Sequence, residues 1–463
     1  MKHTRRKFLQ NCASSGAVMA MPFQLRLARA SGNEFELIAE DFKYPLYEEG
    51  GPESDLWAYN KSSPGPEIRI KRGERVQVKL VNKLDVPTTI HWHGIRIANN
   101  MDGVSGLTQE PVMPGSSFIY DFTVPDAGTF WYHAHHKSWQ QVARGLYGPL
   151  IVDEDTETFD RAHDLTLVLD DWRLDRQGVL QVDSLGALMD WSHAGRLGNW
   201  LTVNGTSNPK FSLNANEPYR LRLINVCNSR ALDIDPGGFD AKLMAFDGMA
   251  FQEPEFLEYG PLSISPSQRV DLLVVPQEGK NFVIEEVSSD QNLPIASFSV
   301  SKNPDSSDMA VPALPQNNLP EPDVKNGRKI TVGLTGGAMG NFEGIVYKGK
   351  KLSGEEFQQT KQFWAMNGVA NLTEKPLFSA RKGETIIIET TNDTAFFHAM
   401  HIHGHHFKIL SGADEGRWRD TFFVDRTQKT TIAFVADNPG KWLFHCHMLE
   451  HAAAGMSSWF EVV

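Results

Sequence analysis

The chain has 463 residues, of which 41% are hydrophobic and 22% charged, a composition typical of globular domains. No stretch reaches the roughly 18 apolar residues that a membrane-spanning helix needs, and the length predicts two or three domains. The formal net charge of −12 disfavours nucleic acid and anionic lipid as partners, and leaves small cations and neutral molecules.

Residues 1–30 have the three parts of an export signal. A twin-arginine start at 4–9 (TRRKFL) precedes a short, weakly apolar core at 12–23 and an A-x-A cleavage site at Ala28-Arg29-Ala30. A disordered basic tail is the alternative, but it would not need all three parts in order. We therefore predict a periplasmic or otherwise exported protein, carried by the twin-arginine pathway.

An internal repeat relates residues 31–154 to residues 327–463. In both copies one glycine precedes a His-x-His pair by eighteen residues, and a second glycine precedes another histidine pair by five. These glycines and histidines are Gly73 and His91, Gly128 and His133, Gly383 and His401, and Gly440 and His445. Each copy contains short alternating runs, such as 75–80 (RVQVKL), separated by Gly, Pro, Asn and Asp. This pattern predicts a β-sandwich in each copy.

Residues 155–302 contain similar short strand-like runs, for example at 219–225 and 269–275, but they contain no paired histidines. The following segment, 303–326, is rich in Pro, Asn, Ser and Asp and is predicted to be an exposed linker. The sequence thus predicts an all-β protein of three sandwiches, with metal-binding residues only in the first and the last.

Four His-x-His pairs carry the strongest signal for a metal site. In a strand, residues i and i+2 point the same way about 6.5–7 Å apart, so one pair can hold one metal ion or two adjacent ions. A single pair is weak evidence, whereas four pairs at duplicated positions make coincidence a poor explanation. They are His91/His93, His133/His135, His401/His403 and His445/His447. Eight imidazoles shared between two domains favour copper over a closed structural zinc site.

The segment around Cys446 adds a second kind of site. A thiolate, with a histidine five residues later at His451 and a methionine ten residues later at Met456, supplies the Cys, His and weak axial Met of blue copper. In an extended strand, His445 and His447 point away from Cys446, so they can hold other ions. The remaining cysteine after residue 30, Cys227, lies in an apolar run and is predicted to be a buried small hydrophobe.

The motifs HWHG (91–94), HAHH (133–136), HAMHIHG (398–404) and HCHMLEHAAAGM (445–456) resemble those of the multicopper oxidases. The resemblance is narrower to bacterial laccase-like members. It implies three cupredoxin-like Greek-key β-sandwich domains in tandem and four copper ions per chain, one type 1, one type 2 and a type 3 pair. O2 and a small reducing substrate are the implied partners. A monomer is sufficient for such a fold.

The same resemblance implies a role for each ligand. His398, Cys446 and His451 would hold the type 1 copper with Met456 axial, and His91 and His401 the type 2 copper. The type 3 pair would take His93, His133, His135, His403, His445 and His447. Electrons would pass from the type 1 copper through Cys446 to the trinuclear cluster, where O2 is reduced to two waters.

Proton delivery is the part of the resemblance in which this chain departs from its relatives. Asp102, eleven residues after His91, matches an acid that serves the cluster in the family, although Asp102-Gly103 also reads as an ordinary turn. Several bacterial relatives have a glutamate directly after the type 1 histidine, where this chain has Ala452. Glu450, on the other side of His451, cannot be assumed to replace it.

The implied reaction is laccase-like, with phenols or aromatic amines as electron donors. A methionine axial ligand lowers the type 1 potential and suits electron-rich donors. Oxidation of Cu(I), Fe(II) or Mn(II) is the alternative, although the fourteen methionines are scattered and form no cluster. A cupredoxin scaffold without turnover is a third hypothesis, and the filled ligand positions argue against it.

Overall fold

The computed structural model describes residues 30–463 except 238–240, 258–259, 289–291, 303–311 and 341. The predicted export signal, except for its last residue, and the first part of the predicted linker therefore lie outside the described residues. No helix within the described ranges is long and apolar enough to cross a membrane. The described remainder of the predicted linker is irregular, and Asn317 within it exchanges hydrogen bonds with the backbone of Ala127.

The first sandwich consists of two facing sheets. One sheet has the order β1-β2-β5-β7, with β3 also paired to β2, and the other has the order β4-β9-β8-β6. The bounds are β1 Ala30–Ser31, β2 Glu34–Tyr44, β3 Ser54–Tyr59, β4 Ile68–Lys71, β5 Arg75–Asn82, β6 Ile90–His93, β7 Ser117–Thr123, β8 Gly128–Ala134 and β9 Tyr147–Asp153. In β5, Val76, Val78 and Leu80 are buried and alternate with polar residues, as the sequence pattern predicts.

The middle sandwich has sheets of order β11-β10-β13-β18-β15-β16 and β12-β20-β19-β14-β17. Its strands are β10 Asp164–Trp172, β11 Trp200–Val203, β12 Lys210–Asn214, β13 Tyr219–Asn225, β14 Leu232–Asp235, β15 Lys242–Phe246, β16 Met249–Phe256, β17 Leu262–Ile264, β18 Arg269–Val274, β19 Phe282–Glu286 and β20 Leu293–Ser301. Strands β13 and β18 are buried along their whole length, so their charged residues need buried partners.

The third sandwich has sheets of order β24-β21-β26-β31-β28-β29 and β25-β33-β32-β27-β30, with a small β22-β23 ribbon. Its strands are β21 Arg328–Gly336, β22 Val346–Tyr347, β23 Lys350–Lys351, β24 Trp364–Met366, β25 Ser379–Ala380, β26 Glu384–Asn392, β27 His398–Ile402, β28 Phe407–Ser411, β29 Trp418–Arg419, β30 Thr421–Val424, β31 Lys429–Ala436, β32 Gly440–Cys446 and β33 Ser457–Val462. The predicted fold of three cupredoxin-type β-sandwiches is confirmed.

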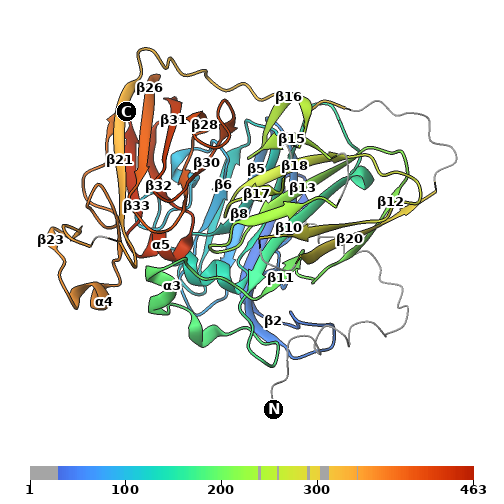
Figure 1. Ribbon diagram of the computed structural model, residues 1–463, viewed down its shortest axis with the longest axis horizontal. Helices are drawn as coiled ribbons and strands as arrows, with labels where there is room; N and C mark the ends of the chain where they lie inside the picture. The colour runs from blue at the N-terminus through green and yellow to red at the C-terminus, as the bar shows by residue number, and fades with distance from the viewer. Residues whose placement is uncertain (1–29, 238–240, 258–259, 289–291, 303–311, 341) are drawn as a thin grey trace.

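Helices are short and lie between strands. They are η2 Asn99–Met101, α2 Ser138–Gln141, η3 Val142–Arg144, η4 Arg161–His163, η5 Val182–Ser184, α3 Leu188–Ser192, α4 Glu356–Thr360 and α5 Leu449–Ala453. Helix α3 of the middle segment lies against α5 of the third sandwich, which follows the Cys446 strand (Figure 1).

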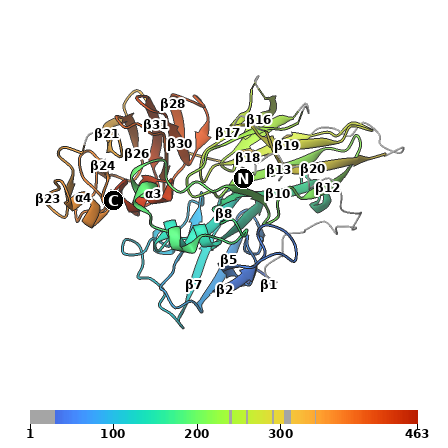
Figure 2. The ribbon, with the colours of Figure 1, turned by 60° about the horizontal axis from the view of Figure 1, so that its bottom comes forward.

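The three sandwiches meet around a common centre (Figure 2). One buried apolar cluster runs through the first and third sandwiches, from Phe35 to Val462, whereas the middle sandwich has a cluster of its own around Leu223 and Phe298. The first and third sandwiches therefore pack as one body, and the edges that carry the histidine pairs face each other across it.

Candidate metal centres

One cluster gathers Cys446 and two histidines from the third sandwich. The Nδ1 atoms of His398 and His451 lie 3.7 and 4.0 Å from the Cys446 sulfur and 3.2 Å from each other. All three side chains are buried. Strand β27 supplies His398, the end of β32 supplies Cys446, and α5 supplies His451. Two imidazole nitrogens and a sulfur thus point at one spot, which is the donor set of a blue copper site.

Met456 closes the loop that carries this cluster. Its backbone carbonyl accepts a hydrogen bond from the Cys446 amide at 3.0 Å, and its own amide donates to the His451 carbonyl at 2.9 Å. The side chain is fully buried. The backbone therefore holds the predicted axial residue beside both Cys446 and His451.

The outer nitrogens of the two histidines are tied to protein groups. His398 Nε2 lies 2.9 Å from the Thr394 hydroxyl, and His451 Nε2 lies 2.6 Å from the backbone carbonyl of His193 in the middle segment. The ring of Trp364 lies 4.1 Å from that of His451, centroid to centroid. These contacts leave Nδ1 as the free ring nitrogen on both histidines, and His451 is joined to the protein surface through the His193 backbone.

Burial sets the protonation states of His451 and Cys446. It lowers the pKa of His451 to about 3, so this imidazole is neutral at pH 7 and can donate a lone pair. Burial also raises the pKa of the Cys446 thiol to about 12, so a bound metal ion must displace its proton.

The eight histidines of the four pairs converge between the first and third sandwiches. Each histidine lies in a group of three whose ring nitrogens are within 4.8 Å of one another. The groups are His91, His93 and His401; His93, His133 and His447; and His135, His403 and His445. All are buried except His135, which is half-buried. Three such groups sharing one volume can hold a cluster of three ions.

Backbone hydrogen bonds set the tautomers of these rings. His91 and His401 each place Nδ1 2.8 Å from a backbone carbonyl, of Asp102 and Asp420 respectively. Their Nε2 atoms are buried and have no hydrogen-bond partner. An orphaned buried nitrogen is costly unless a further atom occupies the space, and a metal ion is such an atom. The donor set therefore fits copper ions at these positions.

Strand alternation separates the two centres. Cys446 points to the His398 and His451 cluster, while His445 and His447 join the histidine groups on the other face. Residue His445 pairs with His401 across β32 and β27, and Cys446 pairs with Met400. A single cysteine, through its two neighbours, thus joins the centres by covalent bonds.

The predicted acid Asp102 and the neighbouring candidate Glu450 lie in different surroundings. The Asp102 carboxylate lies 3.0 Å from Nδ1 of His403 and 3.2 Å from Nδ1 of His91 and is fully buried. The Asp-Gly turn is real as well, since Gly103 has φ +84° and a Cβ there would overlap the Ile90 carbonyl. Glu450 instead accepts hydrogen bonds from Asn228 and Ser229 of the middle sandwich. Glu450 therefore anchors α5 to that sandwich.

Sequence reasoning did not identify three groups at these centres. They are Asp420, which contacts His93 and His401, Arg269, which pairs with Asp420, and the His193 carbonyl on His451. A charged residue within the apolar run 269–275 was the available signal for Arg269. Asp420 lies outside every motif, so no sequence signal pointed to it. The His193 carbonyl reaches His451 from a segment 258 residues away, through tertiary packing.

Comparisons with known proteins agree with this arrangement. Family models described as multicopper oxidase match residues 43–157, 163–302 and 349–463. Multicopper oxidase MmcO from Mycobacterium tuberculosis is 30% identical over 88% of this chain and 83% of its own length. The chain belongs to the multicopper oxidase family, and copper is its cofactor.

Solved structures extend the likeness to nearly the full length. A multi-copper oxidase from Pseudomonas thermotolerans superposes with a TM-score of 0.81 at 32% identity, covering 94% of this chain and all of its own. Lac15 from a marine microbial metagenome gives a TM-score of 0.74 at 36% identity, covering 92% of this chain and 99% of its own. The sequence prediction of the family is thus confirmed.

Proposed function

We propose that this multicopper oxidase is laccase-like, and that it couples four one-electron oxidations of phenols or aromatic amines to the reduction of O2 to two waters. Copper bound at the two centres supplies the one-electron acceptor and the site of O2 reduction. The chain's own contribution is to bind the donor near His451, to link the two centres, and to hold the acid that serves the cluster.

We assign the ligands as the geometric groups suggest. His398, Cys446 and His451, with Met456, form the type 1 site, and His91 with His401 form the type 2 site. The type 3 pair then takes His93, His133 and His447 for one ion, and His135, His403 and His445 for the other. Asp102, beside His403, is the proposed proton donor. The twin-arginine export of the folded protein remains a proposal on the sequence alone.

A cavity beside the type 1 cluster is the observation that carries the laccase-like proposal. It has a volume of about 770 Å³, within the range of small-molecule sites. Its wall includes Phe342, Phe357 and Phe363 from the third sandwich and Ser192 at the end of α3. Three phenylalanines suit a flat aromatic donor, which gains by stacking and by burial of its apolar faces.

The cavity adjoins His451 through two of its lining residues. Ser192 directly precedes His193, whose carbonyl lies 2.6 Å from His451 Nε2. Phe363 directly precedes Trp364, whose ring packs on that of His451. The cavity is thus connected to the type 1 ligand His451 through the backbone of His193 and the ring of Trp364.

Oxidation of metal ions is the second candidate, because two exposed methionines belong to the segments that supply the cavity residues Ser192 and Ala338. Met189 on α3 is 63% exposed, and Met339, beside the lining residue Ala338, is 81% exposed. A hydrogen bond from the Ala338 amide to the Ser192 carbonyl holds the two segments together. Thioethers prefer soft cations, so Cu(I) is the ion that this feature favours.

Oxygen uptake with a panel of donors tests the proposal. We expect the highest kcat/KM for electron-rich phenols and aromatic amines, and lower values for Cu(I), Fe(II) and Mn(II). Phe357→Ala should raise KM for the phenols, because a stacking face of the cavity is lost, and should leave the blue absorption unchanged. Phe211→Ala, at a half-buried phenylalanine on the distant strand β12, is the matched control and should change neither.

A far higher kcat/KM for one metal ion would overturn the laccase-like proposal in favour of a metallo-oxidase. In that case Met189→Leu with Met339→Leu should lower turnover of Cu(I) and leave phenol oxidation unchanged. Equal KM values for the Phe357 variant and the wild type would place the donor elsewhere.

Replacement of the axial residue gives a further prediction. Met456→Leu should raise the type 1 reduction potential while the protein stays blue, because a thioether stabilises oxidised copper and a leucine does not coordinate. Redox titration of the blue absorption measures the change. Met448→Leu, at another fully buried methionine of the same segment, is the control and should leave the potential near that of the wild type. An unchanged potential in Met456→Leu would contradict the axial assignment.

A further inference from the structure

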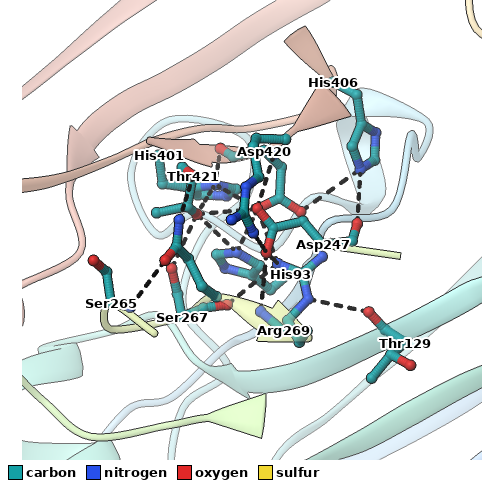
Figure 3. A network of polar contacts seen from close by, with 12 residues as sticks. His93, Thr129, Asp247, Ser265, Ser267, Arg269, His401, His406, Asp420 and Thr421 are labelled. Atoms are coloured by element: carbon teal, nitrogen blue, oxygen red, sulfur yellow. Dashed lines mark hydrogen bonds and ion pairs between the residues drawn. The ribbon is translucent and has the colours of Figure 1, made fainter. Parts of the chain in front are cut away.

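A buried ion pair joins the middle sandwich to the third beside the histidine groups. Arg269, at the start of β18, donates from Nη1 and Nη2 to the two carboxylate oxygens of Asp420 at 2.9 and 2.5 Å. Both side chains are fully buried (Figure 3). This fork fixes the orientation of the carboxylate, since each of its oxygens has a defined donor.

Asp420 contacts two of the predicted copper ligands. Its Oδ1 lies 3.2 Å from His93 Nε2, and its backbone carbonyl lies 2.8 Å from His401 Nδ1 (Figure 3). The two rings stack at 3.8 Å. Their remaining nitrogens, His93 Nδ1 and His401 Nε2, are buried and without a partner. Asp420 therefore holds both rings with the free nitrogen facing the shared volume.

Asp102 makes two comparable contacts from the first sandwich, although its carboxylate faces a different ring nitrogen. Its carbonyl lies 2.8 Å from His91 Nδ1, and its carboxylate lies 3.0 Å from His403 Nδ1. These two rings also stack at 3.8 Å. The duplicated domains thus place one aspartate each beside one predicted type 2 and one predicted type 3 histidine, in mirrored roles.

The two aspartates differ in the charged side chains that pair with their carboxylates. Asp420 is paired with Arg269, whereas no Arg or Lys side chain in the described part of the chain forms an ion pair with Asp102. The middle sandwich adds further contacts on the Asp420 side, since Gln268 donates to the Thr421 carbonyl at 3.0 Å and Ser267 bonds the Thr421 hydroxyl. One carboxylate is held rigidly, and the other is left without a fixed counter-charge.

Packing of the HWHG motif depends on this ion pair. Gly94 has φ +87°, and a Cβ at that position would lie 2.4 Å from Arg269 Nη2 and 2.6 Å from Asp420 Oδ2. The backbone that follows His93 therefore rests directly on the paired charges. The glycine of the motif is required by the arginine of another domain.

We propose that Asp420, held by Arg269, is a positioning residue of the trinuclear copper cluster. Its carboxylate accepts a hydrogen bond from Nε2–H of His93 and so directs His93 Nδ1 to the metal. Its backbone carbonyl accepts from Nδ1–H of His401 and so directs His401 Nε2 there. Through Arg269 the middle sandwich, which has none of the predicted ligands, controls the ligand geometry of the cluster. This inference rests on the proposed assignment of His93 and His401.

Copper retention and the type 2 EPR spectrum test the proposal. The holoenzyme and Asp420→Asn are dialysed against increasing concentrations of a chelator, and the copper remaining is measured. We expect release of copper from the trinuclear cluster of Asp420→Asn at about 10- to 100-fold lower chelator concentration, the usual cost of removing a partner of a ligating histidine. The amide has one acceptor oxygen, which cannot serve both Arg269 and Nε2 of His93 as the carboxylate does. Its type 2 hyperfine splitting should change, because Asp420 Oδ1 also lies 3.7 Å from Nδ1 of His401, and the blue absorption should stay.

A double variant guards against loss of the fold. Asp420→Asn removes one of the two carboxylates that face the buried Arg269 and leaves Asp247, 3.5 Å away, as its partner. Asp420→Asn with Arg269→Met removes both charges of the broken pair, and Asp247 keeps Arg419 at 3.6 Å. The double variant should show the same early release of copper from the cluster. Asp271→Asn is the matched control: Asp271 is equally buried on β18 and pairs with Arg220, but it contacts no histidine of the cluster.

The proposal is overturned if the double variant retains copper and its type 2 spectrum as the wild type does. It is also overturned if Asp271→Asn releases copper from the cluster as early as Asp420→Asn, since the effect would then be one of general stability. Failure of the ligand assignment has a different signature, namely a wild-type protein without a type 2 signal or with fewer than the expected copper ions.

Discussion

Cys446→Ser should abolish the blue colour and the turnover together. The variant removes the thiolate that gives a type 1 site its colour, and a serine hydroxyl does not replace it as a ligand. It also removes the sulfur from the short covalent link between the two centres, because His445 and His447 belong to the histidine groups while Cys446 belongs to the other cluster. Copper analysis should show the type 1 ion missing and the trinuclear ions retained, with a type 2 EPR signal still present.

Cys227→Ser is the control for this prediction. Cys227 is also a buried free cysteine, but it lies in the middle sandwich with its sulfur 3.9 Å from the Leu169 carbonyl. This variant should stay blue and active even if its melting temperature falls. Oxidase activity retained by Cys446→Ser would refute the role of the cysteine as the electron path.

The fold and most of the site were predictable because period and spacing are local properties. Alternation in a strand separates Cys446 from His445 and His447 whatever the rest of the chain does. The equal offsets from Gly73 to His91 and from Gly383 to His401 reveal the duplication without any structure. Two centres built from duplicated strands follow from these two facts.

The residues that hold the predicted ligands in place were not predictable from such patterns. Arg269 and Asp420 are 151 residues apart, and neither belongs to a repeated motif. Strand β18 is buried on both faces, so its charge had to have a partner, but the sequence does not say which one. The orientation of Glu450 likewise depends on how α5 packs against Asn228 and Ser229.

Asp102→Asn should slow the reduction of O2 and leave the entry of electrons intact. An asparagine can still accept the hydrogen bond from His403 Nδ1 through its carbonyl oxygen, so the ring keeps its place, but it cannot pass on a proton. We expect kcat to fall by about 10²- to 10⁴-fold, the usual contribution of a general acid or base. The blue absorption and copper content should match the wild type.

Stopped-flow absorption separates the two half-reactions of this variant. Anaerobic bleaching of the blue band by a phenol should proceed at the wild-type rate, and its recovery after mixing with O2 should be slow. Glu450→Gln is the control, because Glu450 is a buried carboxylate that faces Asn228 and Ser229, and its recovery should be normal. Recovery at the wild-type rate in Asp102→Asn would contradict the role of Asp102 as proton donor and leave Asp102-Gly103 with a structural role in the turn alone.

The contrast between the two mirrored aspartates sharpens this test. Arg269 fixes the orientation of Asp420, and we expect replacement of Asp420 to lower copper affinity. The Asp102 carboxylate contacts histidines, and we expect its replacement to slow proton transfer to the cluster. Normal copper content with slow reoxidation in Asp102→Asn, beside early copper loss in Asp420→Asn, requires distinct roles for two residues that each lie beside two cluster histidines. The structure offers two differences that explain distinct roles: the carboxylates face different ring nitrogens, Nδ1 of His403 and Nε2 of His93, and Arg269 of the middle sandwich pairs with Asp420.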